Sequence, residues 1–184
     1  DGLHAECLSS LNEFSLDQRG MVGTQTSLEF LYRGDEVGSV EQYIFNQIGS
    51  KLAGSWFEVI LQVDGTIRVE LPSPPPSGPG FVGPWDENLL FRAQSLPAYA
   101  INDGQTHHVA VVRDGTSIKI YIDGSDRTWG ASIQAPTDIP LVMGSMYVHS
   151  TSLKDVAVRP NGILDELVIY SHALTSARIN EHVV

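Results

Sequence analysis

The chain has 184 residues, of which 42% are hydrophobic and 18% are charged. This composition excludes a disordered chain, and the length suits a single all-β unit, so we expect residues 1–184 to form one domain. The formal net charge of −11 argues against nucleic acid as a partner, because a phosphate backbone is bound by clustered Lys and Arg side chains. No apolar run approaches about 18 residues, so no membrane insertion is expected.

The numbers of acidic residues and of cysteines indicate where the protein is expected to be found and which metals it could bind. The excess of acidic residues, 22 against 11 basic ones, predicts solubility outside a cell, and some of these acids are candidates for holding calcium, which prefers oxygen ligands. Cys7 is the only cysteine, which excludes an internal disulfide and a cysteine-based zinc site but leaves pairing with another chain open. A chain that begins at Asp1 rather than Met is expected to be a mature product or a module of a longer protein.

Alternating apolar residues predict the elements of the first half. Residues 1–20 carry a weak helical or irregular pattern and are expected to pack on the sheets as a lead-in. Strands are predicted at residues 27–32, 43–48, 56–63 and 66–71. The last two flank Asp64-Gly65, a dipeptide typical of hairpin turns. In the last strand the apolar face is predicted to carry Ile67, Val69 and Leu71, and the polar face Arg68 and Glu70.

Residues 72–84 interrupt this pattern with closely spaced prolines. Proline cannot donate a ladder hydrogen bond, so this segment is not a central strand. We expect a long connection of polyproline type, which is either a solvated excursion or a loop that rims a binding site with Phe81 and Trp85 at its end.

The strongest hairpin signal lies at residues 106–124, where Asp114-Gly115 separates two alternating runs. Ile118, Ile120 and Ile122 are predicted to face the core. A lone hairpin with so apolar a face would not be stable in water, so other strands must cover it.

Later elements complete an all-β pattern. Residues 140–146 and 162–170 are predicted strands, and residues 148–161 are a predicted loop. Thr175 and Ser176 are expected to start a short C-terminal helical turn and to supply its cap residue. Strands recurring about every 8 to 12 residues, without long helices, predict a closed or double-layered all-β fold.

Three blocks follow one another in the second half of the chain: DGQTHHVAVVRDGTSIKIYIDG at 103–124, IPLVMGS at 139–145 and GILDELVIYSHALTSARI at 162–179. Together they resemble the laminin-G-like branch of the concanavalin A-like lectin/glucanase superfamily. The resemblance implies a two-sheet antiparallel jelly-roll sandwich. It leaves function open, because this fold hosts lectins, adhesion modules, glycanases and lyases.

The resemblance also implies a metal. Members of this superfamily often carry a structural calcium on the convex side, held by an acid at the start of the last strand and by backbone carbonyls. Asp165 occupies that position. The alternative for Asp165 is a surface acid near a turn, and no calcium-binding loop motif is present in the sequence.

The search for catalytic residues starts from the acids. Glycan hydrolysis needs two carboxylates on one side of a sugar bond, and the family's glucanases carry them as Glu-x-Asp-x-x-Glu on one strand, a run that is absent here. The nearest acid pairs, Asp35/Glu36, Asp86/Glu87 and Asp165/Glu166, are adjacent in sequence and would point to opposite faces of a strand. A non-catalytic chain is therefore expected.

Two short motifs are weighed against structural explanations. His107 and His108 are neighbours on a predicted strand and would face opposite ways, so they are expected to be structural rather than to share a zinc ion. Arg33-Gly34-Asp35 matches an integrin-binding tripeptide, which requires an exposed loop tip to bind.

Sugar binding requires an exposed aromatic ring and a few planar polar groups. Two loop clusters offer them, and we predict these as ligand-binding residues: Trp85 with Asp86 and Asn88, and Trp129 with Asp126 and Arg127. The alternative for each tryptophan is an indole that caps the core. Trp56 opens a strand and is expected to be core, whereas Tyr147 and His149 are weaker candidates.

These observations predict a glycan-binding or adhesion module of a larger extracellular or cell-surface protein. Its partners would be a glycan or cell-surface ligand and other domains of the same polypeptide. The alternatives are a receptor-binding module, an unusual polysaccharide hydrolase or lyase, and an architectural domain that packs on a catalytic neighbour.

Overall fold

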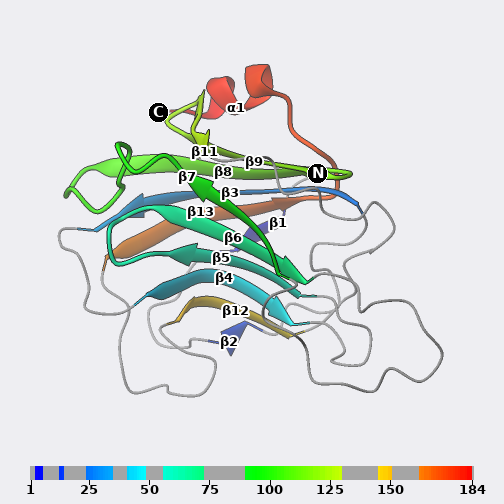
Figure 1. Ribbon diagram of the computed structural model, residues 1–184, viewed down its shortest axis with the longest axis horizontal. Coiled ribbons are helices and arrows are strands. Elements are labelled where there is room, and N and C mark those ends of the chain that lie inside the picture. Colours follow the sequence, from blue (N-terminus) through cyan, green and yellow to red (C-terminus); the bar gives the residue numbers. More distant parts are fainter. Residues whose placement is uncertain are drawn as a thin grey trace.

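The computed structural model describes residues 3–5, 13–14, 24–34, 41–48, 56–72, 90–129, 145–150 and 162–183. They form two antiparallel sheets and one short helix (Figure 1). The six-stranded sheet has the order β1-β13-β3-β8-β9-β10. Its strands are β1 (Leu3–Ala5), β3 (Gln25–Arg33), β8 (Thr106–Asp114), β9 (Ser117–Ile122), β10 (Ser125–Asp126) and β13 (Ile163–Tyr170).

The seven-stranded sheet has the order β11-β7-β6-β5-β4-β12-β2. Its strands are β2 (Glu13–Phe14), β4 (Gln42–Ile48), β5 (Trp56–Leu61), β6 (Ile67–Pro72), β7 (Leu90–Ser95), β11 (Thr128–Trp129) and β12 (Ser145–Ser150). This two-sheet antiparallel sandwich confirms the predicted fold class.

The core lies between the two sheets, and alternation along the strands explains its composition. Ile118, Ile120 and Ile122 are buried in it, as predicted. Ile67, Val69 and Leu71 enter it from the other sheet, again as predicted, and the rings of Phe45 and Phe57 meet edge to face with centroids 6.2 Å apart. Removing these apolar faces from water is the main stabilising contribution to such a sandwich.

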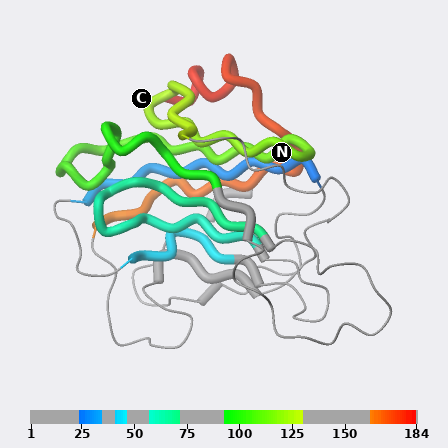
Figure 2. The backbone as a smooth tube through the Cα atoms, viewed as in Figure 1, coloured from blue at the N-terminus to red at the C-terminus, as the bar shows by residue number. Residues whose placement is uncertain are grey.

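A smaller cluster lies on the outer face of the six-stranded sheet, beneath helix α1 (Ser176–His182, red in Figures 1 and 2). The Thr175 side chain accepts a hydrogen bond from the Arg178 amide, which confirms the predicted cap. Ile179 of the helix packs into this cluster. His182 Nδ1 lies 2.8 Å from Oε2 of the buried Glu29, so a polar contact also ties the helix to β3.

Several predicted boundaries were wrong. Described parts of residues 1–20 are strands, β1 and β2, rather than helical, since each pairs with a strand from the far end of the chain. Residues 148–150 belong to β12, not to a loop, because they pair with β4. Strand β7 and the short strands β10 and β11 were missed, since their sequences are short or weakly alternating. No helix among the described residues is long and apolar enough to cross a membrane.

His107 joins two loops at one end of β8. Its Nδ1 lies 2.8 Å from Oδ2 of Asp123 and its Nε2 lies 3.0 Å from Oδ1 of Asp103. His108 points to the opposite face and is buried, with Nε2 3.5 Å from Oε1 of Glu29. The predicted opposite orientation of the two histidines is confirmed, and both have carboxylate neighbours that explain them structurally.

Replacing His107 by glutamine is expected to remove a pH-dependent part of the stability. Burial lowers the pKa of His107, but the hydrogen bonds to Asp123 and Asp103 outweigh it and the net pKa is raised. A raised folded-state pKa contributes stability that is complete below the unfolded value, about 6.5, and is lost as pH rises through the folded value. Urea unfolding should therefore show a deficit of up to about 1 kcal/mol for the variant near pH 5.5 and a smaller one near pH 9. A deficit that is constant with pH would contradict this assignment.

Candidate functional site

The outward face of the seven-stranded sheet carries the largest set of interacting polar side chains in the described part of the chain. Residues opposite one another on neighbouring strands project to the same face of a sheet. One such row runs across five strands and comprises Tyr43, Ile60, Arg68, Gln94 and Trp129. Because Val59, Leu61, Ile67 and Val69 point into the core, the residues that alternate with them in this row point outward.

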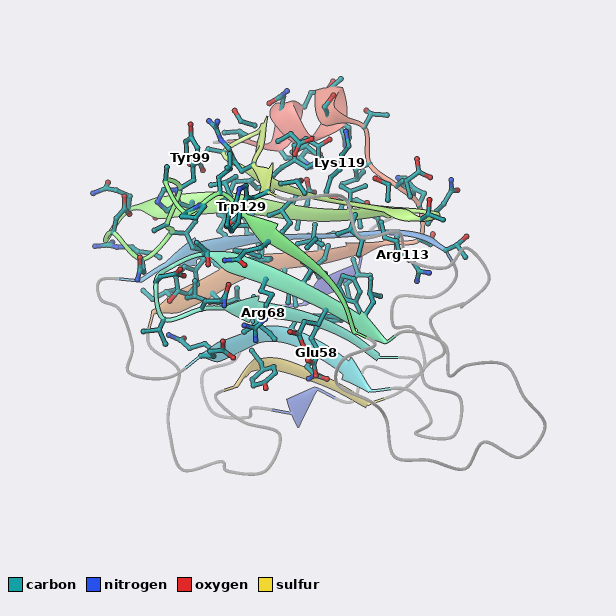
Figure 3. The ribbon with its side chains drawn as sticks, in the orientation of Figure 1. Glu58, Arg68, Tyr99, Arg113, Lys119 and Trp129 are labelled. Atoms are coloured by element: carbon teal, nitrogen blue, oxygen red, sulfur yellow. The ribbon has the colours of Figure 1, made fainter. Side chains whose placement is uncertain are left out.

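A second row lies two residues along the strands. Asn46, Glu58 and Glu70 are successive partners on β4, β5 and β6. The backbone positions of Tyr147 on β12 and Arg92 on β7 continue this row at its two ends. We call the side chains of Tyr43, Asn46, Glu58, Arg68, Glu70, Gln94 and Trp129 the polar face. Figure 3 labels Glu58 and Arg68 near the middle of the sheet and Trp129 closer to its β11 edge.

Arg68 organises the middle of the polar face. Its two terminal nitrogens donate to the two carboxylate oxygens of Glu41, at 2.8 and 2.9 Å. Its Nε lies 2.8 Å from Oε1 of Glu70, an ion-pair contact that lacks the angle of a hydrogen bond. The Glu70 side chain is only 7% exposed, so this contact lies in the buried part of the polar face. Arg68 therefore lies between two carboxylates and contacts both.

Glu58 lies beside this pair and has an unusual protonation equilibrium. Burial, and then the nearby charge of Glu70, raise its pKa to about 7, against the weaker opposing effects of Asn46 and Arg68. Asn46 Nδ2 donates to Glu58 Oε1 at 2.7 Å. Burial, and then the charges of Glu58, Glu41 and Glu70, raise the pKa of Tyr43, so its side chain stays a neutral phenol. Near neutral pH, Glu58 is thus divided between an acid and a carboxylate.

Trp129 supplies an exposed aromatic ring at the edge of this face. The chain leaves β9 at the Asp123-Gly124 turn, pairs briefly as β10, and crosses to the other sheet as β11 (yellow-green in Figure 2). Thr128 Oγ1 accepts a hydrogen bond from the Ile120 amide, which fixes this crossing. Trp129 follows at once and is 52% exposed. The alternative of a core-capping indole is thereby excluded for this tryptophan.

The other two residues predicted beside Trp129 lie close to it in sequence and have structural partners. Asp126 Oδ1 accepts hydrogen bonds from the amide and hydroxyl of Thr128, at 3.1 and 2.7 Å, so it shapes the crossing. The Arg127 guanidinium lies over the ring of Tyr99, 3.7 Å from its centroid. Tyr99 is 38% exposed and was not predicted. Its stacking with Arg127 adds a second flat surface near the same sheet edge.

The remaining predicted site residues do not lie on the described part of the polar face. Trp85, Asp86 and Asn88 lie outside the described residues, as does Asp35 of the tripeptide, and so do the side chains of Trp56, Tyr147 and His149. Asp165 is exposed on β13, where its Oδ1 accepts a hydrogen bond from the Glu166 amide at 2.9 Å, next to a bulge. Within the described ranges no three acidic, histidine or cysteine side chains gather as a metal site would require.

Sequence reasoning missed the acid pair. Glu58 and Glu70 share one face as direct partners on neighbouring strands, whereas the search considered acids on one strand or adjacent in sequence. The signal that could have found them is the length of the turn, because a three-residue loop at 63–65 sets residue 58 opposite residue 70.

The family assignment comes from a comparison with family models. The model described as concanavalin A-like lectin/glucanases superfamily, Laminin_G_3, matches residues 23–180. A comparison with curated proteins gave no match.

Solved structures share the fold at low identity. Domain 4 of AbnA, a GH43 extracellular arabinanase from Geobacillus stearothermophilus solved with arabinotriose, is 18% identical with a TM-score of 0.59, over 90% of this chain and 68% of that one. The CBM40 of Ruminococcus gnavus IT-sialidase bound to α2,6 sialyllactose is 15% identical with a TM-score of 0.62, over 99% and 98%. The binding domain of Paraclostridial Mosquitocidal Protein 1 is 13% identical with a TM-score of 0.60, over 98% and 44%. With the family model covering most of the sequence, the chain belongs to the concanavalin A-like lectin/glucanases superfamily.

Proposed function

We propose that this chain is a non-catalytic glycan-binding module of a larger extracellular protein, and that the glycan lies across the polar face. The exposure of Trp129 in the same row as Gln94 and Arg68 is the observation that carries the proposal. A sugar ring presents an apolar face to an indole and hydroxyl groups to planar polar side chains. The edge indole and the neighbouring carboxylates and amides provide both kinds of contact.

The comparisons support this proposal at the level of fold. Similar structures include one domain in complex with arabinotriose and one carbohydrate-binding module bound to sialyllactose. Others are the binding domains of toxins, which keeps a protein-receptor partner as the alternative.

A glycan array with the intact chain tests the proposal. We expect binding to at least one class of oligosaccharide, lost on competition with that free sugar. Absence of binding to every glycan, together with capture of a receptor protein that survives sugar competition, would replace the glycan by a protein partner.

Polysaccharide cleavage is a second candidate because Glu58 and Glu70 are direct cross-strand partners, and the pKa of Glu58 is about 7. Glycosidases usually act with two carboxyl groups whose different environments give them different pKa values. Incubation with polysaccharides and analysis of the reducing ends distinguishes the candidates: release of products that stops in Glu58→Gln would establish an enzyme.

A structural calcium at Asp165 is also proposed, on the position of this acid next to the β13 bulge. Thermal unfolding with calcium and with a chelator tests it. The expected result is a lower melting temperature in chelator, which Asp165→Asn no longer shows.

A further inference from the structure

The polar face has a clear charge character. Its described side chains, together with Glu41, include three carboxyl groups, Glu41, Glu58 and Glu70, but one guanidinium, Arg68. Since Arg68 is engaged by Glu41 and Glu70, it has no free donor pair with which to receive an acidic ligand in a bidentate manner. The whole chain adds to this effect with its net charge of −11.

The same face has acceptors that no described donor satisfies. Asn46 Nδ2 donates a hydrogen bond to Glu58 Oε1, whereas no described residue donates one to Glu58 Oε2. The Asn46 side chain is fully buried, yet its Oδ1 has no hydrogen-bond partner among the described residues. A buried amide oxygen without a partner is costly, so a donor is expected beside it in the functional state. Acceptors that lack donors are suited to a ligand rich in hydroxyl groups.

We propose that the polar face selects uncharged oligosaccharides and rejects acidic ones, with Glu58 and Asn46 accepting hydrogen bonds from the ligand's hydroxyl groups. This inference rests on the proposed function and names its ligand class. Trp129 and Glu58 stand on strands three spacings apart, β11 to β5, or about 14 Å at ~4.8 Å per spacing. The ligand is therefore an oligosaccharide long enough to contact both.

The selectivity should depend on pH through Glu58. The groups that face Glu58 are Tyr43, Asn46 and Glu41 on the β4 side, and Arg68 and Glu70 on β6. Above pH 7 the Glu58 carboxylate repels an acidic sugar, and below it the protonated group does not. Neutral oligosaccharides do not titrate in this range, so a pH effect on the preference reports the protein.

Calorimetry with matched ligands tests the inference. The probes are hexamers of glucose, galactose and mannose and the corresponding hexamers of glucuronate, galacturonate and mannuronate, which exchange a hydroxymethyl group for a carboxylate. At pH 8 and low salt we expect each neutral hexamer that binds to do so at least about tenfold more tightly than its acidic partner. The preference should shrink at pH 6, in high salt and in Glu58→Gln. Glu166→Gln is the matched control, since it removes one exposed carboxylate on β13 of the other sheet and should keep the preference.

The outcomes distinguish a wrong ligand class from the absence of glycan binding. An acidic hexamer that binds as tightly as its neutral partner overturns the inference but leaves the proposed function standing. An equal loss of preference in Glu58→Gln and Glu166→Gln assigns the effect to net charge and also overturns it. If no hexamer and no arrayed glycan binds, the inference and the proposed function fail together.

Discussion

Replacing Arg68 by alanine is expected to lower the free energy of unfolding by about 3–5 kcal/mol at neutral pH, the cost of removing the guanidinium from beside a buried carboxylate. Glu70 is the residue left behind, because its side chain is 7% exposed and lies 2.8 Å from Arg68 Nε. Glu41 loses two hydrogen bonds as well but is 39% exposed and can be solvated. Urea unfolding of the intact chain measures the loss.

Two further variants show whether the buried Glu70 carboxylate is the cause. The double variant Arg68→Met, Glu70→Gln removes this carboxylate together with the guanidinium, and we expect most of the stability to return. Arg178→Ala is the matched control: it breaks an exposed ion pair with Glu181 and should cost no more than about 0.5 kcal/mol. A loss in Arg68→Ala as small as that of the control would show that Glu70 does not rely on Arg68.

The sandwich was predictable because its strands alternate strongly. Along β9 the alternating residues Ile118, Ile120 and Ile122 enter the core, and the Asp123-Gly124 turn has positive φ at both residues, 50° and 74°, as a type I′ hairpin requires. The edge strands β1, β2, β10 and β11 were not predictable in the same way. They are two or three residues long, too short to show an alternating pattern, and β1, β2 and β11 pair with strands distant in the sequence.

The length of the turn between β5 and β6 explains why the pairing of Glu58 with Glu70 was not predicted. A two-residue Asp64-Gly65 loop would place Glu58 opposite Leu71. The structure instead has a three-residue loop, in which the Gln62 amide donates to the Thr66 carbonyl and Gly65 has φ of 83°. Glu58 thereby pairs with Glu70. A shift of one residue exchanges the faces of a strand, so the loop length decides whether the two carboxyl groups meet.

Replacing Trp129 by alanine is expected to weaken glycan binding about 30-fold, or ~2 kcal/mol, while the chain stays folded with a melting temperature only modestly lower. The binding loss follows from the indole's place in the row of Gln94 and Arg68, where it is the exposed aromatic surface next to polar groups. The modest effect on stability follows from its exposure of 52%, because about half of the indole stays in water in the folded chain. Calorimetric titration with the glycan found on the array and thermal unfolding measure the two quantities.

Ile163→Ala is the matched control, since Ile163 is 63% exposed but lies on β13 of the other sheet. It removes exposed apolar surface away from the polar face and should leave affinity intact. Trp129→Phe keeps a flat ring and should recover part of the affinity, because stacking depends on ring area rather than on the indole nitrogen. Equal affinity in the wild type and Trp129→Ala would mean that the sugar does not use the β11 edge. Loss of affinity in Ile163→Ala instead would move the ligand to the six-stranded sheet, and the carboxyl groups around Arg68 would then have a purely structural role.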